Sequence, residues 1–140
     1  MTINEIQDEI IEEFSYYEDW MEKYEHIIQL GKELPIIDPA HKTDDLLIQG
    51  CQSRVWLHAD YKEGIVYFTA DSDAIITKGL VSLMISVLNK QKPKDIAEAD
   101  LYFIEKIGLQ SHLSPTRSNG LLSMLKQMKL YALALTSIEN

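Results

Sequence analysis

The first thirty residues alternate between apolar and polar positions with the period of an amphipathic helix. Apolar side chains recur every three or four residues, and the stripe consists of Ile3, Ile6, Ile10, Phe14, Tyr17, Met21, Tyr24 and Ile28. Two capping-box patterns, Thr2-x-x-Glu5 and Ser15-x-x-Glu18, indicate helix starts. The pattern therefore predicts two helices that break near Ser15.

The period changes in the next part of the chain. Gly31 is expected to end the second helix as a C-cap, and Pro35 and Pro39 indicate a loop that reaches about Asp44. Branched and aromatic residues then predict three short strands, at Leu46–Gln49, Arg54–Ala59 and Ile65–Ala70. Residues 60–64 (DYKEG) are expected to form the hairpin loop between the last two strands.

The second half of the chain is predicted to be helical. Asp71, Ser72 and Asp73 offer N-cap oxygens to a helix that carries Ile76, Leu80, Leu83, Met84 and Val87. A short helix is expected over 96–107, with Gly108 at its end, and a last helix over 118–137, with Gly120 at a closely packed start. We expect one α+β domain over residues 1–140, a small antiparallel β-sheet with helices packed on one face.

Composition narrows the function classes. The 140 residues are 46% hydrophobic and 25% charged, as in ordinary soluble proteins, and no apolar run is long enough to span a membrane. The net charge is −9, and the first 25 residues hold nine acidic residues and one basic residue. This charge argues against a nucleic-acid partner. A solvated helix face is the favoured interpretation of the acidic segment, a docking surface the alternative, and a cytoplasmic location the simplest expectation.

The chain has a single cysteine, Cys51. One cysteine excludes an internal disulfide, a CxxC redox pair and a multi-cysteine metal site. Gly50 before it and Gln52 and Ser53 after it are typical of a loop. A lone cysteine is more often inert packing than a reactive group, and a reactive thiolate needs access and positive charge nearby. The two arginines, Arg54 and Arg117, are the permanent cations available.

Other side chains offer weaker chemistry. His112 is a candidate base for a Cys–His pair, but it lies in a turn before a helix (111–115), and a simple hydrogen bond to the backbone is the preferred interpretation. The four histidines have no metal-binding spacing, so we expect no metal site. Asp71 and Asp73 could act as paired carboxylates, but helix capping explains them better.

Taken together, several ordered motifs resemble the SufE family of sulfur acceptors, also called cysteine desulfuration proteins. The motifs are residues 48–57 (IQGCQSRVWL), 70–80 (ADSDAIITKGL) and 107–121 (IGLQSHLSPTRSNGL), with 20–35 (WMEKYEHIIQLGKELP) also similar. The resemblance covers essentially the whole chain and implies a fold similar to SufE and to IscU-type scaffolds.

The resemblance implies a sulfur-transfer role. Cys51 matches the position of the family's acceptor, which takes persulfide sulfur from a pyridoxal-phosphate (PLP) cysteine desulfurase of the SufS type. The acceptor stimulates that desulfurase and passes sulfur to an iron–sulfur scaffold complex of the SufBCD type. It implies no cofactor on this chain, since PLP belongs to the desulfurase, and an activator subunit more than a stand-alone enzyme. Homodimer formation is left open.

The resemblance also implies roles for neighbouring residues. The acceptor loop is expected to lie against apolar side chains and to swing outward on docking, with Gly50 as the hinge. Arg117 and the turn from Asp71 to Asp73 are expected to support docking or loop control. His112 and Asn119 belong to the same motif and are expected to be structural.

Two positions depart from the family pattern, because Leu46 stands where Asn is common and Arg54 where Gln is commoner. Both lie close to Cys51 in sequence, and the family's Asn would supply hydrogen bonds near the acceptor loop. The departures therefore bear on the conformation of that loop more than on the identity of the acceptor.

Two other functions stay open at the level of the sequence. One is a non-catalytic adaptor that activates its partner by surface contact alone, for example through the acidic N-terminal helices. The other is a Cys–His hydrolase that uses Cys51 and His112, which would need an oxyanion site and a substrate cleft.

Overall fold

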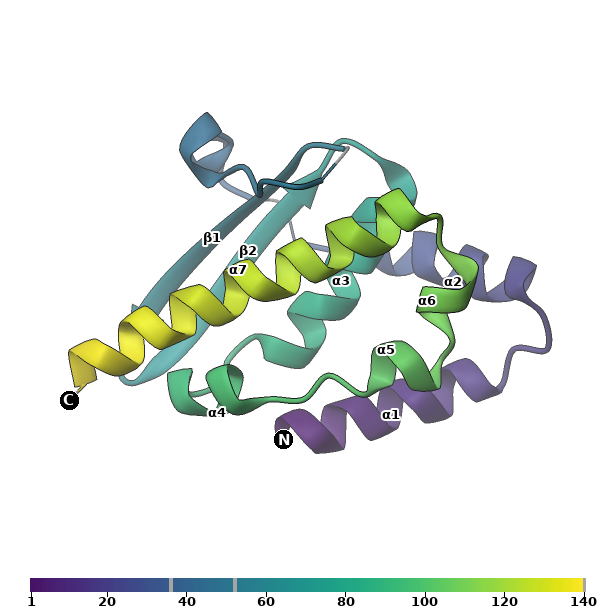
Figure 1. Ribbon diagram of the computed structural model, residues 1–140, viewed down its shortest axis with the longest axis horizontal. Coiled ribbons are helices and arrows are strands. Elements are labelled where there is room, and N and C mark those ends of the chain that lie inside the picture. The colour runs from purple at the N-terminus through teal and green to yellow at the C-terminus, as the bar shows by residue number, and fades with distance from the viewer. Residues whose placement is uncertain (36, 52, 140) are drawn as a thin grey trace.

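The computed structural model describes residues 1–35, 37–51 and 53–139, arranged as helices around one β-hairpin (Figure 1). The α-helices are α1 (Ile3–Ser15), α2 (Trp20–Lys32), α3 (Ile75–Leu88), α4 (Pro93–Glu98), α5 (Phe103–Lys106), α6 (Leu109–His112) and α7 (Pro115–Glu139). Two 3₁₀ turns, η1 (Pro39–His41) and η2 (Asp44–Leu46), precede the strands β1 (Val55–Lys62) and β2 (Ile65–Ser72). In the described ranges no helix is both long and apolar enough to cross a membrane.

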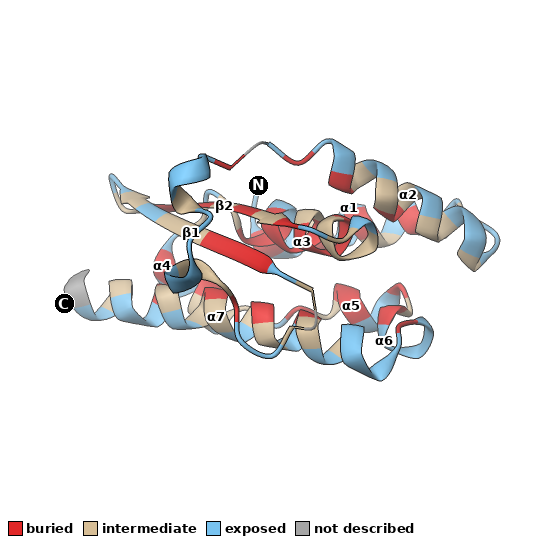
Figure 2. Ribbon diagram, turned by 90° about the horizontal axis from the view of Figure 1, so that it is seen from above, coloured by how far each residue is buried: buried red, intermediate tan, exposed pale blue. Residues whose placement is uncertain are grey.

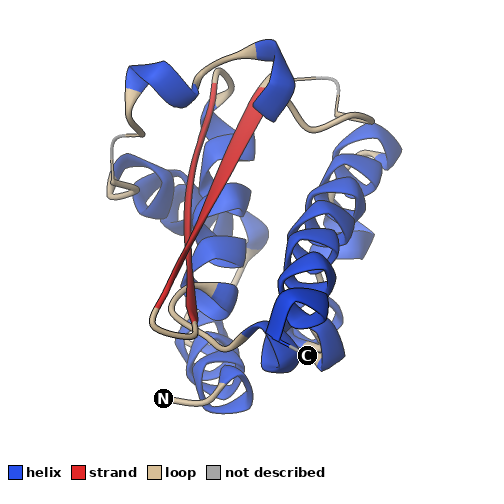
Figure 3. Ribbon diagram, turned by 90° about the vertical axis from the view of Figure 1, so that its left-hand side faces the viewer, coloured by secondary structure: helices blue, strands red, loops and turns tan. Residues whose placement is uncertain are grey.

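The predicted α+β class is confirmed, with a sheet of two antiparallel strands. Val55 pairs with Ser72 and Leu57 with Ala70, so alternate residues of both strands share one face. That face is buried against helices, with α3 packed along β2 and α7 alongside (Figures 2 and 3). The other face is partly covered by the segment that holds η1 and η2, where His41 stacks on His58 with ring centroids 3.6 Å apart.

The prediction of a strand at Leu46–Gln49, the first of the three predicted strands, is wrong. Asp44–Leu46 forms the turn η2, and Leu47 makes only an isolated bridge to Trp56. The chain then turns at Gly50, whose φ of 89° is open to glycine at little cost. The hairpin loop is also shorter than predicted, because Glu63 and Gly64 both take positive φ and join the strands in a two-residue turn.

The predicted break near Ser15 is confirmed, but the start of the second helix is different. Thr2 and Glu5 form the expected capping box. Ser15 instead donates its hydroxyl hydrogen to the Glu12 carbonyl at 2.5 Å, and Asp19 caps α2 by accepting the Glu22 N–H at 2.9 Å. Acidic side chains at this end of a helix also interact favourably with the helix dipole.

The helices of the second half also differ from the predicted ranges. The expected helix over 96–107 is split between α4 and α5, and Gly108, in the left-handed conformation, lies at the end of α5 as predicted. The last helix begins at Pro115 rather than near Ser118, because proline is well suited to the first position of a helix. Arg117 therefore lies in the first turn of α7.

Gly31 is not the C-cap of α2. The helix continues to Lys32, with Glu33 as its C-cap, and Gly31 is buried against Gly79 of α3. A Cβ placed on Gly31 would lie 2.8 Å from the Gly79 nitrogen, and one on Gly79 would lie 2.2 Å from the Ile27 carbonyl oxygen. The two helices therefore meet backbone to backbone, and this contact fixes α3.

We predict that Gly79→Ala destabilises the protein by about 3 kcal/mol, the upper end of the cost of overpacking, because the added methyl meets backbone atoms that have little freedom to move. The free energy of unfolding in urea measures this. Ser86→Ala, an exposed position on the same helix, is the matched control and should change it by less than about 0.5 kcal/mol. Equal stability of the two variants would contradict the close helix contact.

Candidate functional site

Cys51 lies against the first turns of α7. Its Sγ donates a hydrogen bond to the Gly120 carbonyl oxygen at 3.6 Å. A Cβ on Gly120 would lie 3.5 Å from that sulfur, and a Cβ on Gly50 would lie 2.6 Å from the Ser123 Oγ. Glycines at 50 and 120 thus allow the segment to lie directly on the helix. We call the described residues 49–51 and 53 the Cys51 loop, and we call the contact of Cys51 with α7 its closed position.

Both ends of the Cys51 loop are held by hydrogen bonds. The Ile48 N–H donates to the Val55 carbonyl at 2.9 Å, and the Arg54 N–H donates to the Asp73 carboxylate at 3.0 Å. Asp73 was predicted to cap α3, but that helix begins at Ile75 with Ala74 at the N-cap and no side-chain cap. Its carboxylate instead anchors the loop beside β1.

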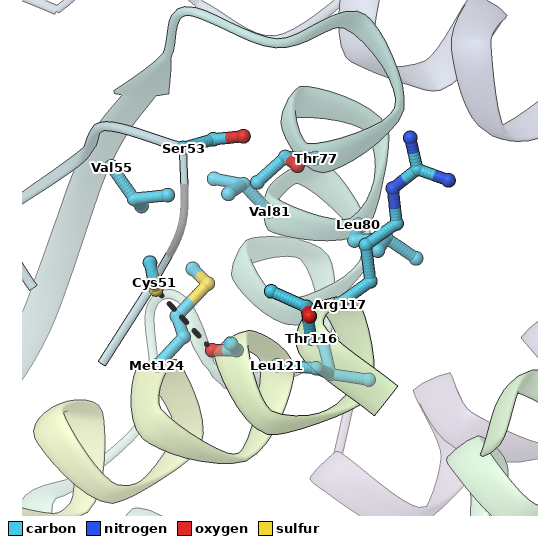
Figure 4. A pocket seen from close by; sticks show the side chains of 11 residues that line it. Cys51, Ser53, Val55, Thr77, Leu80, Val81, Thr116, Arg117, Leu121 and Met124 are labelled. Carbon is cyan, nitrogen blue, oxygen red and sulfur yellow. Dashed lines mark hydrogen bonds between the residues drawn. The ribbon is translucent and has the colours of Figure 1, made fainter. Parts of the chain in front are cut away.

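Cys51 faces a pocket of about 90 Å³ between α3, α7 and the start of β1 (Figure 4). The lining is mostly apolar, with hydroxyl groups and one arginine: Ser53, Val55, Thr77, Leu80, Val81, Thr116, Arg117, Gly120, Leu121 and Met124. A cavity needs roughly 10–15 Å³ to hold a water molecule, so there is room beside the sulfur for a further atom.

The closed position stabilises a protonated thiol. Burial raises the pKa of the Cys51 thiol above its usual value. Arg117, the charged residue of the lining, directs its guanidinium away from the sulfur (Figure 4). Because the thiolate is the nucleophile, the closed position lowers the reactivity of Cys51.

Asp71 of β2 connects the segment that holds η1 and η2 to α3 through two ion pairs. Its carboxylate lies 3.2 Å from the Lys42 ammonium and 3.3 Å from the Lys78 ammonium. Burial opposes ionisation, but the Ser72 N–H and the two ammonium groups outweigh it and hold the pKa of Asp71 below its usual value. Lys42 also lies over the Trp56 ring, 4.7 Å from its centroid. Asp71 is therefore a cross-link rather than the predicted helix cap.

The structure does not pair His112 with Cys51. The imidazole stacks on Trp20, with ring centroids 3.9 Å apart, and its Nδ1 lies 3.0 Å from the Gly108 carbonyl oxygen. The Tyr24 hydroxyl donates to the His112 carbonyl oxygen. The predicted hydrogen bond of His112 to the backbone is confirmed. His112 does not line the pocket beside Cys51, so a Cys–His hydrolase is not supported.

The remaining predicted site residues are distributed unevenly. Ser53 lines the pocket. Asn119 and Arg54 are exposed, and Gln52 lies outside the described residues. Sequence reasoning missed the α3 residues Thr77, Leu80 and Val81 as pocket lining, since an apolar helix face is read as ordinary core.

A scan against known protein families matches residues 8–132 to SufE, described as an Fe-S metabolism associated domain. The chain belongs to the SufE family. This membership places the chain in Fe–S metabolism and sulfur transfer, and implies association with a cysteine desulfurase.

Individual relatives also match this chain over most of its length. A SufE-like protein of Rhizobium meliloti is 38% identical over 127 residues, which cover 87% of this chain and 91% of that protein. A SufE-like protein of Rhizobium etli is 39% identical over 127 residues, covering 87% and 86%. The solution structure of a hypothetical protein from Thermus thermophilus has a TM-score of 0.78 at 19% identity over 94% of this chain and 96% of that one, which shows that the two chains share a fold.

The closed position predicts that a cysteine introduced at position 120 forms a disulfide with Cys51. The Cβ of Cys51 lies 3.9 Å from a Cβ built on Gly120, within the span of about 3.5–4.5 Å that disulfides require. Mild oxidation of the Gly120→Cys variant should therefore join the two cysteines within one chain. Intact mass and thiol titration should show the loss of two hydrogens and of both free thiols.

Leu122→Cys is the control for this variant, because Leu122 is an exposed residue of the same helix. It should cross-link only between chains. A Gly120→Cys protein that keeps both thiols free under oxidation would contradict the closed position.

Proposed function

We propose that Cys51 accepts sulfur from the persulfide of a PLP-dependent cysteine desulfurase and passes it to an iron–sulfur scaffold complex. The observation that carries this proposal is the setting of the single thiol, which lies in a short anchored loop, hydrogen-bonded to α7 and beside a pocket with room for one more atom. The resemblance of residues 48–57 to the SufE motif also implies that Cys51 is the acceptor.

The transfer is an exchange at sulfur that needs no oxidant. The Cys51 thiolate attacks the outer sulfur of the donor persulfide and forms a new S–S bond. The S–S bond of the donor breaks, and its electron pair leaves with the donor cysteine as a thiolate. Cys51 then carries –S–S–H. The chain needs no cofactor for this step, because cleavage of the C–S bond belongs to the PLP of the desulfurase.

Docking must bring Cys51 out of the closed position. The contacts that hold it there are weak, since one S–H···O hydrogen bond contributes about 1 kcal/mol or less. A protein interface can readily offset that cost. Outside the closed position the pKa of the thiol falls back toward its usual value. The thiolate therefore forms when Cys51 is exposed to the persulfide of the docked desulfurase.

Charged groups around the loop support the docking role. Arg117 is exposed in the first turn of α7 and directs its guanidinium outward (Figure 4). Lys42 and Lys78 flank the Asp71 carboxylate, which lies on β2 opposite Trp56 of β1. On a chain with net charge −9, this local group of cations favours a partner surface that is acidic around its donor cysteine.

A second candidate is an adaptor that acts by surface contact alone. The acidic residues of α1, α2 and the connection between them are all exposed, which favours a docking surface for a basic partner: Glu5, Asp8, Glu9, Glu12, Glu13, Glu18, Asp19, Glu22 and Glu25. The two candidates differ in whether the thiol of Cys51 is required.

Sulfur uptake tests the proposal. Incubated with a cysteine desulfurase, PLP and free cysteine, the protein should gain the mass of one sulfur atom on Cys51, measured by intact-mass and peptide mass spectrometry. Cys51→Ser should remain folded and gain nothing, whereas His112→Ala should still gain sulfur. If Cys51→Ser stimulates the desulfurase as fully as the wild type, the adaptor is the better account.

Arg117 supplies a separate prediction about docking. Arg117→Ala should slow sulfur uptake from the desulfurase about tenfold, because removing a charge at the rim of an interface mainly slows association. Alkylation of Cys51 by iodoacetamide in the free protein should be unchanged, since the guanidinium points away from the sulfur. Arg117→Lys, which keeps the charge, should recover part of the rate. An uptake rate unaffected by Arg117→Ala would exclude Arg117 from docking.

A further inference from the structure

The outer side of α7 carries exposed leucines at helical spacing. Leu122, Leu130 and Leu133 are 47%, 47% and 53% exposed, although leucine is among the residue types most often buried. Lys126, which is also exposed, lies between them. At 3.6 residues per turn these four residues fall within about a quarter of the helix circumference, and we call them the α7 stripe. Single exposed leucines are common, but a continuous apolar stripe is typical of a binding surface.

The α7 stripe faces away from Cys51. The residues of α7 that line the pocket beside Cys51 include Arg117, Leu121 and Met124, and the helical repeat places them roughly opposite the stripe. Figure 2 shows α7 at the margin of the molecule, with exposed positions along its length. The stripe therefore belongs neither to the pocket nor to the core, and packing within the chain does not explain its leucines.

The charge along α7 is positive, in contrast to the chain as a whole. Residues 115–138 contain three basic residues, Arg117, Lys126 and Lys129, and no acidic residue, whereas the net charge of the chain is −9. Lys129 lies beside the stripe and donates a hydrogen bond from its Nζ to the Ala99 carbonyl oxygen at the end of α4. An apolar surface with positive charge at its centre and edge is complementary to apolar side chains flanked by carboxylates.

We propose that the α7 stripe docks an amphipathic helix of another protein, one whose apolar side chains are flanked by Asp or Glu. Because the stripe and the pocket lie on opposite sides of α7, a partner held there leaves Cys51 open to a second protein. The chain can then stay attached to one protein while Cys51 meets another.

A second copy of this chain fits the stripe less well. In a two-fold pairing of two α7 helices through the stripe, Lys126 lies near the middle and would face the Lys126 of the other copy. Like charges opposed across an interface weaken association, and each copy also carries a net charge of −9. A carboxylate-bearing partner removes this repulsion.

Two synthetic peptides of about 15 residues test the charge of the partner. Both repeat leucine at helical spacing, and the remaining positions are glutamate in one peptide and lysine in the other. Each is titrated into the wild-type protein at physiological ionic strength, where charges more than about 8 Å apart are largely screened. Leucine methyl signals in NMR spectra report the binding. The Leu–Glu peptide should shift the signals of the stripe, and the Leu–Lys peptide should leave them unchanged.

Variants of exposed residues separate the contributions of charge and apolar contact. Lys126→Glu should weaken binding of the Leu–Glu peptide about tenfold and allow the Leu–Lys peptide to bind. The double variant Leu130→Gln with Leu133→Gln should weaken the Leu–Glu peptide at least about tenfold, because it removes the apolar contact. Met21→Gln is the matched control, since Met21 is 68% exposed on α2, and it should leave the affinity unchanged.

The proposal is overturned if the Leu–Glu peptide leaves the signals of the stripe unshifted, or if it binds wild type and Lys126→Glu equally well. Sedimentation supplies a third test. Wild-type protein should be monomeric, and self-association that the Leu130→Gln and Leu133→Gln double variant abolishes would make a second copy the occupant and overturn the proposal.

A last measurement checks that the two sides of α7 act independently. Saturating Leu–Glu peptide should leave the rate of alkylation of Cys51 by iodoacetamide unchanged, and a slower rate would contradict simultaneous docking. These experiments use neither a desulfurase nor a persulfide. Failure of sulfur uptake would therefore refute the proposed function without affecting this proposal, and the reverse also holds.

Discussion

The pocket beside Cys51 depends on the direct contact between the backbones of α2 and α3. Gly31 and Gly79 leave no side chain between the two helices, so α3 is fixed at a separation that any larger residue would increase. Thr77, Leu80 and Val81 lie on α3 around this contact, and they form one wall of the pocket. The pocket is thus built largely on helices, while Cys51 itself lies on a short loop that this scaffold positions.

The closed position protects the Cys51 thiol and does not activate it. A nucleophilic cysteine normally requires a nearby cation or a helix N-terminus, but Cys51 meets a helix carbonyl and an apolar pocket, both of which favour the thiol. In the closed position, the contacts described for Cys51 therefore include no cation directed at its sulfur. Arg117 directs its guanidinium away from the sulfur, and Lys42 and Lys78 are paired with the Asp71 carboxylate.

The sequence predicted those features whose signal is local. The amphipathic stripe of α1 and α2, the hairpin and the position of Cys51 in a loop all follow from periodicity or turn chemistry, and they are present. The misassigned features depend on partners distant in sequence. Gly31 resembles a helix terminus until Gly79 is placed against it, and Asp73 resembles a helix cap until the Arg54 N–H is found on its carboxylate. Leu46–Gln49 has the composition of a strand, but Gly50 turns the chain after one bridge.

The anchoring of the Cys51 loop limits its reach. Ile48 is tied to Val55 and Arg54 to Asp73, so Cys51 stands three positions along the chain from each fixed point. A fully extended chain spans at most about 3.3–3.6 Å per residue, which gives a tether of about 10 Å. A group recessed farther than this below the surface of another protein could be reached by Cys51 only if one anchor were released or if this molecule entered the recess. The tether length thus limits how deeply recessed a partner group Cys51 can contact.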